Sequence, residues 1–466
     1  MLTKRQELVL AELKGKRAAV VGIGLRSGVP LIRFLLEAGC SVVACDRKPA
    51  ERLSDVLPAL QGLPVDYQLG EGYLADLDCC DLLFRTPGMR PDLPELLAAV
   101  KSGAKLTSEI ELVFALAEAA ITAVTGSDGK TTTTSLVAAM LRADGRQVYL
   151  GGNIGHSLIE EVLGIQPTDE IVLELSSFQL MGMQQSPQSA VITNLSPNHL
   201  DYHSSMQEYV DAKTNIFAHQ SGDDLTILNW DNPVTRELGQ SVPARTQWFS
   251  RRERVDSGAC LIGEQLALVQ GEQVDAVCAV DDLVLPGWHS VENMLAAAAI
   301  CRDKGVSLAA IRQVASSFAG VEHRLEFVRE LRGVRYYNDS IASSPTRTAA
   351  GLAALRSPVV LIAGGYDKKI PFQPLAEAMV GRVRALALIG QTAAQIADAV
   401  HSLHGDCLAA VPIRQFASLE EAVAWANSQA LPGDAVVLSP ACASFDMFKD
   451  FEQRGNIFKQ LVSTLN

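Results

Sequence analysis

A short glycine-rich stretch carries the strongest chemical signal in the sequence. It follows the apolar run at residues 121–125 and precedes a helical pattern over residues 132–145. Between a strand and a helix, glycines let backbone N–H groups face phosphate oxygens, and the positive end of the helix dipole attracts the phosphate charge. A lysine neutralises charge and a threonine hydroxyl can bind Mg²⁺. We therefore predict a nucleotide-phosphate loop that consists of Gly126, Ser127, Asp128, Gly129, Lys130, Thr131 and Thr132.

The spacing of this loop departs from the strict GxxxxGK[ST] pattern. Val124 stands where that pattern has its first glycine, so only the compact form GxxGKT remains. The alternative without a function is an ordinary glycine turn at the start of a helix. Because lysine and threonine follow the second glycine in a strand-turn-helix context, the sequence favours phosphate binding.

Three further polar residues follow apolar runs. Glu174 ends a predicted buried strand, His199 lies in a loop rich in proline, asparagine and histidine, and Lys213 lies on the helix after it. Carboxylate and imidazole bind divalent cations, whereas a lysine on an amphipathic helix is by default a solvated charge. From the residues alone, Glu174 could instead be an edge residue or a helix cap, and His199 a surface or packing residue.

A second glycine turn lies near the N-terminus. Gly22, Gly24 and Gly28 form GxGxxxG rather than GxGxxG, and Asp46 ends the following strand. In a nicotinamide enzyme an acid at that place would bind ribose. An oxidoreductase and a purely structural tight turn therefore stay open as alternatives.

The elements that must position these residues fall into three α/β segments. From Arg17 a strand, turn, helix and second strand form a βαβ unit, which predicts a Rossmann-like domain over residues 1–118. The segment 119–320 predicts a central ATPase-like domain with a parallel sheet, and its region 251–273 predicts strands or excursions on the rim. Alternating strands and helices predict a second Rossmann-like domain over residues 321–466.

Composition excludes several other classes. The chain of 466 residues is 48% hydrophobic and 20% charged with a net charge of -13, which argues against a general nucleic-acid binder. No run of about 18 apolar residues suggests membrane insertion. The nine cysteines lack CxxC spacing and are expected to be buried, reduced thiols. We expect a cytoplasmic monomer.

The motifs together resemble those of the Mur ligase and folylpolyglutamate synthetase superfamily, over essentially the whole chain. The resemblance rests on the compact GxxGKT loop and on five further stretches: residues 151–155 (GGNIG), 174–180 (ELSSFQL), 198–201 (NHLD), 338–340 (NDS) and 439–455 (SPACASFDMFKDFEQRG). The last two, with the glycine turn near the N-terminus, are most similar to the D-glutamate-adding members. Sister ligases that use another amino acid, or that add glutamate to folate, stay open.

The resemblance implies a ligase that joins D-glutamate to UDP-N-acetylmuramoyl-L-alanine in peptidoglycan precursor synthesis, with ATP and two Mg²⁺ ions. It implies that Lys130 stabilises the β,γ phosphates and that Thr131 and Glu174 hold one Mg²⁺. His199 and Lys213, the latter as a carbamate, would hold the second ion. Asn293, Arg324 and Asp339 would contact the nucleotide, although Ser290 stands where relatives commonly carry asparagine.

The resemblance also implies two substrate sites. The uridine nucleotide would contact Gly24, Leu25, Arg26, Asp46, Arg47 and Thr86, with Asn153 and His199 near its muramoyl-alanine end. D-Glutamate would contact Ser343, Arg347, Lys368, Ser444, Phe445 and Phe451. Some relatives have a pocket lysine where this chain has Ile341, so we expect Arg347 or Lys369 to replace it.

Overall fold

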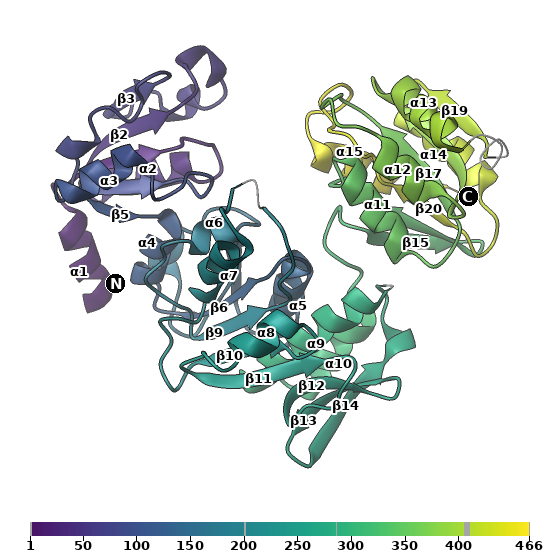
Figure 1. The fold of residues 1–466 in the computed structure, drawn as a ribbon, viewed down its shortest axis with the longest axis horizontal. Helices are drawn as coiled ribbons and strands as arrows, with labels where there is room; N and C mark the ends of the chain where they lie inside the picture. Colours follow the sequence, from purple (N-terminus) through teal and green to yellow (C-terminus); the bar gives the residue numbers. More distant parts are fainter. Residues whose placement is uncertain (1, 200–201, 286, 405–410, 466) are drawn as a thin grey trace. The chain divides into compact units, whose positions relative to one another are not determined.

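The structure is a computed structural model that describes residues 2–199, 202–285, 287–404 and 411–465. Its strands form three sheets, coloured purple to blue, teal, and green to yellow along the chain in Figure 1. Two compact units are present. The first consists of residues 1–280 and 292–314 and contains two sheets, and the second consists of residues 281–291 and 315–466 and contains the third.

The first sheet has five parallel strands in the order β3-β2-β1-β4-β5. Its strands are β1 (Arg17–Val21), β2 (Ser41–Asp46), β3 (Val65–Leu69), β4 (Leu82–Arg85) and β5 (Lys105–Thr107). Helices α1 (Lys4–Leu13), α2 (Gly28–Glu37), α3 (Pro94–Lys101) and α4 (Glu109–Leu116) accompany them. The strand order reverses between β1 and β4, the usual place for a ligand in such sheets. The predicted Rossmann-like architecture is confirmed.

The central sheet has nine strands in the order β14-β13-β12-β11-β10-β9-β6-β8-β7. Its strands are β6 (Ala120–Thr125), β7 (Val148–Gly152), β8 (Glu170–Glu174), β9 (Ser189–Ile192), β10 (Leu225–Asn229), β11 (Arg245–Ser250), β12 (Ser257–Ile262), β13 (Gln265–Gln270) and β14 (Gln273–Ala279). Its helices are α5 (Lys130–Ala143), α6 (Ser177–Leu180), α7 (Met206–Thr214), α8 (Pro233–Leu238), α9 (Trp288–Asp303) and α10 (Leu308–Ser317). In the sheet order from β12 through β6 to β7, each strand pairs with its neighbour in parallel, which confirms the predicted parallel sheet.

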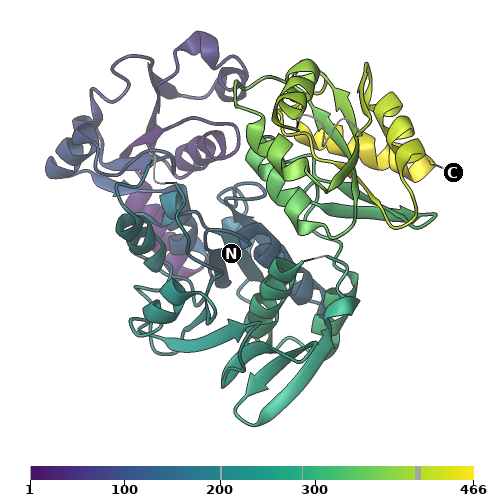
Figure 2. The same cartoon turned by 45° about the vertical axis from the view of Figure 1, so that its right-hand side comes forward.

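Strands β12, β13 and β14 pair antiparallel at one edge of this sheet. Strands β13 and β14 form the long hairpin that projects at the bottom of Figures 1 and 2. The region 251–273 was predicted as strands or excursions on the rim, and the strand alternative is the correct one. A two-residue turn suffices for such antiparallel pairing, so no crossover helix is needed here.

The third sheet has six strands in the order β15-β16-β20-β17-β18-β19. Its strands are β15 (Glu326–Leu331), β16 (Val334–Asn338), β17 (Val359–Gly364), β18 (Val383–Ile389), β19 (Ile413–Phe416) and β20 (Ala435–Leu438). Helices α11 (Pro345–Ala354), α12 (Gln373–Met379), α13 (Ala393–His404), α14 (Leu419–Gln429) and α15 (Phe451–Thr464) accompany them. Among the described strands of this sheet, β15 alone pairs antiparallel, with β16. The domain limits 1–118, 119–320 and 321–466 stay predictions.

Burial explains why the strands read as nearly continuous apolar runs. All residues of β8, β9, β10 and β17 are buried, as expected for strands with both faces of the sheet covered. No helix in the described residues is both long enough and apolar enough to span a membrane. The described cysteines are free thiols, but Cys79 is exposed and Cys278 half-buried, so the expected burial of all cysteines is wrong.

Candidate active site

The predicted phosphate loop is a left-handed turn between β6 and α5. Gly126 has φ +147° and Gly129 has φ +79°, conformations that side chains rarely adopt. A Cβ atom at Gly126 would lie 1.9 Å from the Thr193 hydroxyl oxygen, and one at Gly129 would lie 2.2 Å from Oδ1 of Asn293. Gly129 is the N-cap of α5 and brings no side chain to the first amides of the helix. An anion is the natural partner for such amides, so the geometry favours phosphate over a structural turn.

The segment after β9 holds this loop in place. Asn194 accepts a hydrogen bond from Ser127 N at its carbonyl (2.8 Å) and from Asp128 N at its side chain (3.1 Å). The Thr193 hydroxyl donates to the Asp128 carbonyl, and the Ser127 hydroxyl donates to the Ser196 carbonyl. Our sequence analysis missed these residues, although their polar run directly after an apolar strand was a usable signal.

The predicted catalytic lysine lies over the same loop. Lys130 Nζ donates to the carbonyls of Gly126 (3.0 Å) and Ser127 (2.8 Å). Thr131 is buried and Thr132 is half-buried in the first turn of α5. The Thr133 hydroxyl donates to Oδ1 of Asn293, which brings the predicted nucleotide residue Asn293 against the loop.

Glu174 lies beside the loop because β8 pairs with β6 in parallel, with Val124 opposite Glu174. Its side chain is 2% exposed, and its Oε1 accepts a hydrogen bond from Nδ2 of Asn153 at 2.7 Å. Among the described residues, Oε2 is buried with no hydrogen-bond partner. The cap of α6 is Ser176, so the alternative of a capping role for Glu174 is wrong. An unpaired buried carboxylate oxygen is costly and fits a cation ligand.

Lys213 is buried directly beneath the loop. Its side chain is among the largest fully buried ones, and Nζ donates to the Thr125 hydroxyl at 3.0 Å. Burial, aided by the nearby charge of Lys130, holds the pKa of the Lys213 amine well below its usual range. The default expectation of a solvated charge is therefore wrong, because α7 packs the face that carries Lys213 against the sheet.

His199 adopts a left-handed backbone conformation with φ +53° after β9. Its ring lies against that of Phe178, with the centroids 4.9 Å apart. The motif residues Leu200 and Asp201 lie outside the described residues. Within the described parts of the chain, no three His, Cys, Asp or Glu side chains come together as a cation site. Substrate phosphates and water must supply further ligands to any Mg²⁺ bound here, as is usual for this ion.

Within the first unit, residues of the first sheet and of the central part of the chain line a cavity of about 150 Å³. Its lining includes the predicted substrate residues Arg26, Thr86 and Asn153, together with Glu109 and Ser157, which sequence analysis missed. Burial raises the pKa of Glu109, whose Oε1 accepts a hydrogen bond from the Ser157 hydroxyl. The cavity lies at the strand-order reversal, where a ligand is expected.

The remaining predicted nucleotide residues do not line this cavity in the described structure: Gly24, Leu25, Asp46 and Arg47. Gly24, Leu25 and Arg47 are exposed. The Asp46 carboxylate accepts hydrogen bonds from the amides of Ile23 (3.1 Å) and Lys48 (2.8 Å). Asp46 thus stabilises the glycine turn, and both of its oxygens already have backbone partners.

In the second unit, the structure brings some of the predicted amino-acid pocket together. Lys368 Nζ donates to the hydroxyl (3.2 Å) and the carbonyl (3.3 Å) of Ser343. Phe445 is 67% exposed and lies edge-on to Tyr366, a residue that sequence analysis missed. The other predicted pocket residues differ in exposure: Ser444 is buried, Phe451 half-buried and Arg347 exposed.

Asp339 forms a buried polar group at the end of β16. It accepts hydrogen bonds from the Ser439 hydroxyl (2.6 Å) and from Leu325 N (3.1 Å). Burial raises the pKa of Asp339 to about 7, while the charges of Arg324 and Arg347 act in the opposite direction. The predicted residues Arg324 and Arg347 therefore lie near this carboxyl.

Replacing Asp339 by asparagine is expected to change the pH dependence of stability. An unfolded aspartate has a pKa of about 3.9, so the folded protein binds more protons than the unfolded chain between about pH 4 and 7. The carboxyl's contribution to stability is largest below this window and is lost as the pH rises through it. By urea unfolding, the stability of the wild type relative to Asp339→Asn should fall by more than about 1 kcal/mol from pH 5 to pH 8. A constant difference would contradict the raised pKa.

Comparisons with known proteins agree over the whole chain. Three family models match: the Mur ligase MurD-like N-terminal domain at residues 16–108, the Mur ligase middle domain at 124–301, and the Mur ligase glutamate ligase domain at 323–442. The chain is 50% identical over 459 residues to the UDP-N-acetylmuramoylalanine-D-glutamate ligase of Acetivibrio thermocellus, covering 97% of each protein. It is 45% identical over 466 residues to the enzyme of that name from Ruminiclostridium cellulolyticum, covering 100% of both.

Solved structures show the same fold at low identity. The UDP-N-acetylmuramate-alanine ligase of Thermotoga maritima matches with a TM-score of 0.57 at 20% identity, over 96% of this chain and 100% of that one. A MurF structure from Acinetobacter baumannii also matches with a TM-score of 0.57, at 16% identity, over 98% of this chain and 92% of that one. These likenesses concern the fold alone.

Proposed function

Because this chain belongs to the Mur ligase family, we propose that it joins D-glutamate to UDP-N-acetylmuramoyl-L-alanine and converts ATP to ADP and phosphate. One observation carries the proposal: beside the phosphate loop, on the neighbouring strand β8, the buried Oε2 of Glu174 has no hydrogen-bond partner among the described residues. That arrangement suits an ATP-dependent ligase, and a glycine turn with an acid at Asp46 does not by itself support the nicotinamide alternative. We further propose that the protein acts in the cytoplasm as a monomer.

The reaction must first activate a carboxylate, which is a poor electrophile. In the proposed mechanism, an oxygen of the L-alanine carboxylate attacks the γ-phosphorus of ATP and ADP leaves, which forms an acyl phosphate. The amine of D-glutamate then attacks the acyl carbon, phosphate leaves, and the amine gives up its proton as the amide forms. Lys130 and the first amides of α5 neutralise the phosphate charge that otherwise opposes the approach of two anions.

Two Mg²⁺ ions belong to this proposal, with Thr131 and Glu174 holding one, and His199 and Lys213 the other. Bound Mg²⁺ would supply positive charge that offsets the negative charges of the phosphates and of the acceptor carboxylate. Glu174 fits this role through its buried Oε2. A protonated Lys213 does not fit, because an ammonium repels a cation. Its lowered pKa favours the neutral amine. This form can add CO₂ and release a proton to give a carbamate, whose single negative charge is shared by two oxygens.

We place the uridine nucleotide in the cavity beside Arg26 and Thr86. The Asn153 side chain connects that cavity with Glu174, because its amide donates to Oε1 of Glu174 while the residue also lines the cavity. This connection supports a position for the muramoyl-alanine end close to the phosphate loop. Gly24, Leu25, Asp46 and Arg47 would contribute from the chain around the glycine turn.

The decisive experiment combines the purified protein with ATP, Mg²⁺, UDP-N-acetylmuramoyl-L-alanine and a panel of amino acids. Phosphate release and product mass are measured for D-glutamate, L-glutamate, L-alanine and a diamino acid. We expect rapid phosphate release and the mass of one added glutamate with the D isomer alone. Equal turnover with another amino acid would support a sister ligase, and a folate acceptor used in place of the uridine nucleotide would overturn the proposed substrate.

Replacing Lys368 by alanine is expected to raise the KM for D-glutamate by tenfold or more, about 1.4 kcal/mol of binding. The reason is that a dianionic amino acid needs positive charge as it enters a site that already holds phosphate. One of the variants Arg347→Ala and Lys369→Ala should show the same effect, because Ile341 cannot supply a second cation. The KM for ATP should change little in each case.

The matched control for these three variants is Arg414→Ala. It removes an exposed cation from β19, an edge strand of the same sheet. It should leave both KM values unaltered. If Lys368→Ala, Arg347→Ala and Lys369→Ala also leave the D-glutamate KM unaltered, this placement of the pocket is wrong.

A further inference from the structure

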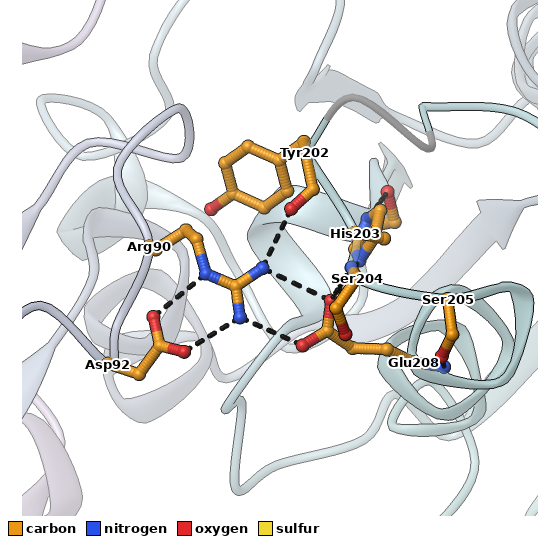
Figure 3. Close-up of polar contacts among 8 residues, drawn as sticks. Arg90, Asp92, Tyr202, His203, Ser204, Ser205 and Glu208 are labelled. Carbon is orange, nitrogen blue, oxygen red and sulfur yellow. Dashed lines mark hydrogen bonds and ion pairs between the residues drawn. The ribbon is translucent and has the colours of Figure 1, made fainter.

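Arg90 lies between two carboxylates, as Figure 3 shows. Toward its own loop, Nε and Nη2 donate to the two oxygens of Asp92 at 2.9 and 2.7 Å. Toward α7, Nη1 and Nη2 donate to the two oxygens of Glu208 at 3.1 and 2.8 Å. Nη1 also donates to the carbonyl of Tyr202 at 2.7 Å. These five contacts match the five N–H groups of a guanidinium, an arrangement that lysine cannot reproduce.

Glu208 also contacts the loop that carries His199. Its Oε2 accepts a hydrogen bond from Ser204 N at 2.7 Å and lies 3.5 Å from Nδ1 of His203. Arg90 and this amide hold the pKa of Glu208 at about 2, so the carboxylate stays ionised under any ordinary assay condition. The side chains of Arg90 and Glu208 are 26% and 24% exposed, which shields the pair from much of the solvent.

His203 connects this pair with the residues around Glu174. Its side chain is fully buried, Nε2 lies 2.9 Å from the Ser177 hydroxyl, and its ring stacks on Phe178. Phe178 also contacts the ring of His199. The carbonyl of His199 accepts hydrogen bonds from the amides of Tyr202 (3.0 Å) and His203 (2.9 Å). Contacts therefore run without a break from Arg90 to the predicted metal ligand His199.

The backbone at His199 needs such support. A non-glycine residue in the left-handed region is strained and persists only where its surroundings over-determine it. Arg90 donates a hydrogen bond to the Tyr202 carbonyl, and Glu208 accepts one from the Ser204 amide. These backbone groups lie three and five residues after His199. The pair therefore adds two side-chain anchors to the backbone hydrogen bonds that the His199 carbonyl accepts from the amides of Tyr202 and His203.

Arg90 itself belongs to the turn that lines the nucleotide cavity. Thr86 and Pro87 are part of the cavity lining, and Met89 N donates to the Thr86 carbonyl. The Arg85 guanidinium donates to the Met89 carbonyl from one side and to the carbonyls of Phe178 and Met181 from the other. Arg85 thus connects the turn at residues 86–92 with α6, and Arg90 connects it with α7.

We propose that Arg90 and Glu208 are a positioning pair that fastens the nucleotide-cavity turn to the His199 loop, so that the predicted metal ligand is oriented when the substrate binds. Neither residue is one of the proposed catalytic residues or metal ligands. The inference rests on the proposed function, because it assigns the cavity to the uridine nucleotide and His199 to Mg²⁺. It adds two residues, 118 positions apart in the chain, that neither the motifs nor the charge pattern indicated.

The test compares Arg90→Ala, Arg90→Lys and Glu208→Gln with the matched control Asp92→Asn, which removes the charge of the other carboxylate but leaves the bridge to Glu208. For each protein we would measure kcat, the Mg²⁺ concentration for half-maximal rate, Mn²⁺ binding in the presence of ATP by electron paramagnetic resonance, and hydrogen exchange at the Ser204 amide. The first and third variants should raise the half-maximal Mg²⁺ concentration at least fivefold, weaken Mn²⁺ binding similarly and expose the Ser204 amide. The KM for D-glutamate should stay within twofold.

Several outcomes decide the proposal. Asp92→Asn should change each quantity less than twofold, and Arg90→Lys should behave like Arg90→Ala because charge alone does not reproduce the forked contacts. Wild-type values in Arg90→Lys would overturn the proposal. Unchanged Mn²⁺ binding and unchanged Ser204 exchange in Glu208→Gln would also overturn it. So would a lowered melting temperature with a normal Mg²⁺ dependence in Arg90→Ala and Glu208→Gln. If the wild type makes no D-glutamate product, the proposed function fails, whereas Mn²⁺ binding and exchange still test the pair.

Discussion

Lys130→Ala is expected to lower kcat by at least about 100-fold, the usual cost of losing one electrostatic contact to a transition state. The ammonium lies over the phosphate loop, where it donates to the carbonyls of Gly126 and Ser127. On ATP binding these contacts can be exchanged for phosphate oxygens. Stopped-flow or steady-state phosphate release with saturating substrates measures the effect.

The fold should survive this change. Hydrogen bonds that do not involve Lys130 hold the loop, chiefly those from Ser127 and Asp128 to Asn194. The melting temperature should therefore stay within a few degrees of the wild type. Lys101→Ala removes an exposed lysine from α3 and serves as the matched control. A Lys130→Ala enzyme that keeps more than about a tenth of its kcat would contradict the catalytic role.

Lys213→Ala is expected to lose most of its activity and to regain part of it in formate or acetate. Under the carbamate proposal, the variant leaves a small cavity beneath the loop, and a carboxylate that enters it can replace the two anionic oxygens. The buried Nζ, which now donates to the Thr125 hydroxyl, marks where that carboxylate would bind. The measurement is kcat as a function of formate concentration at constant ionic strength.

Lys304→Ala offers a control that removes another shielded lysine, away from the phosphate loop. Lys304 is nearly buried and pairs with Glu170 at 2.9 Å, at the start of β8, whereas Glu174 ends that strand. Replacing Lys304 should lower the melting temperature, and added formate should change neither this melting temperature nor kcat. If Lys213→Ala is fully active in buffer freed of bicarbonate, the carbamate proposal is wrong.

Local patterns in the sequence predicted the architecture well. The first βαβ unit was read from an apolar run, a glycine turn and a helical period, and β1, α2 and β2 confirm it. These signals are local, because side-chain periodicity and turn residues depend on neighbours a few positions away. The half-exposed strand β3 was missed for the same reason, since its sequence Val-Asp-Tyr-Gln-Leu has no buried run.

The sequence also determined the chemical types at the site. A glycine, a lysine and a threonine in the order of the phosphate loop, between an apolar run and a helical pattern, predict anion binding, and the loop conformation at Gly126 and Gly129 agrees. Glu174 and Asn153 were named from motifs, and the structure joins them by a hydrogen bond. The specific roles at the metal and amino-acid sites stay predictions.

Only the tertiary structure decided which of these groups are buried and how they are held. Whether Lys213 is solvated depends on the face of α7 that packs on the sheet, and its own helix does not show this. Arg90 and Glu208 read as separate surface charges in sequence, but chain folding brings their side chains within 2.8 Å of each other. Burial and pairing are properties of distant partners, so the sequence determined the elements and reactive groups while packing decided their charge states and positions.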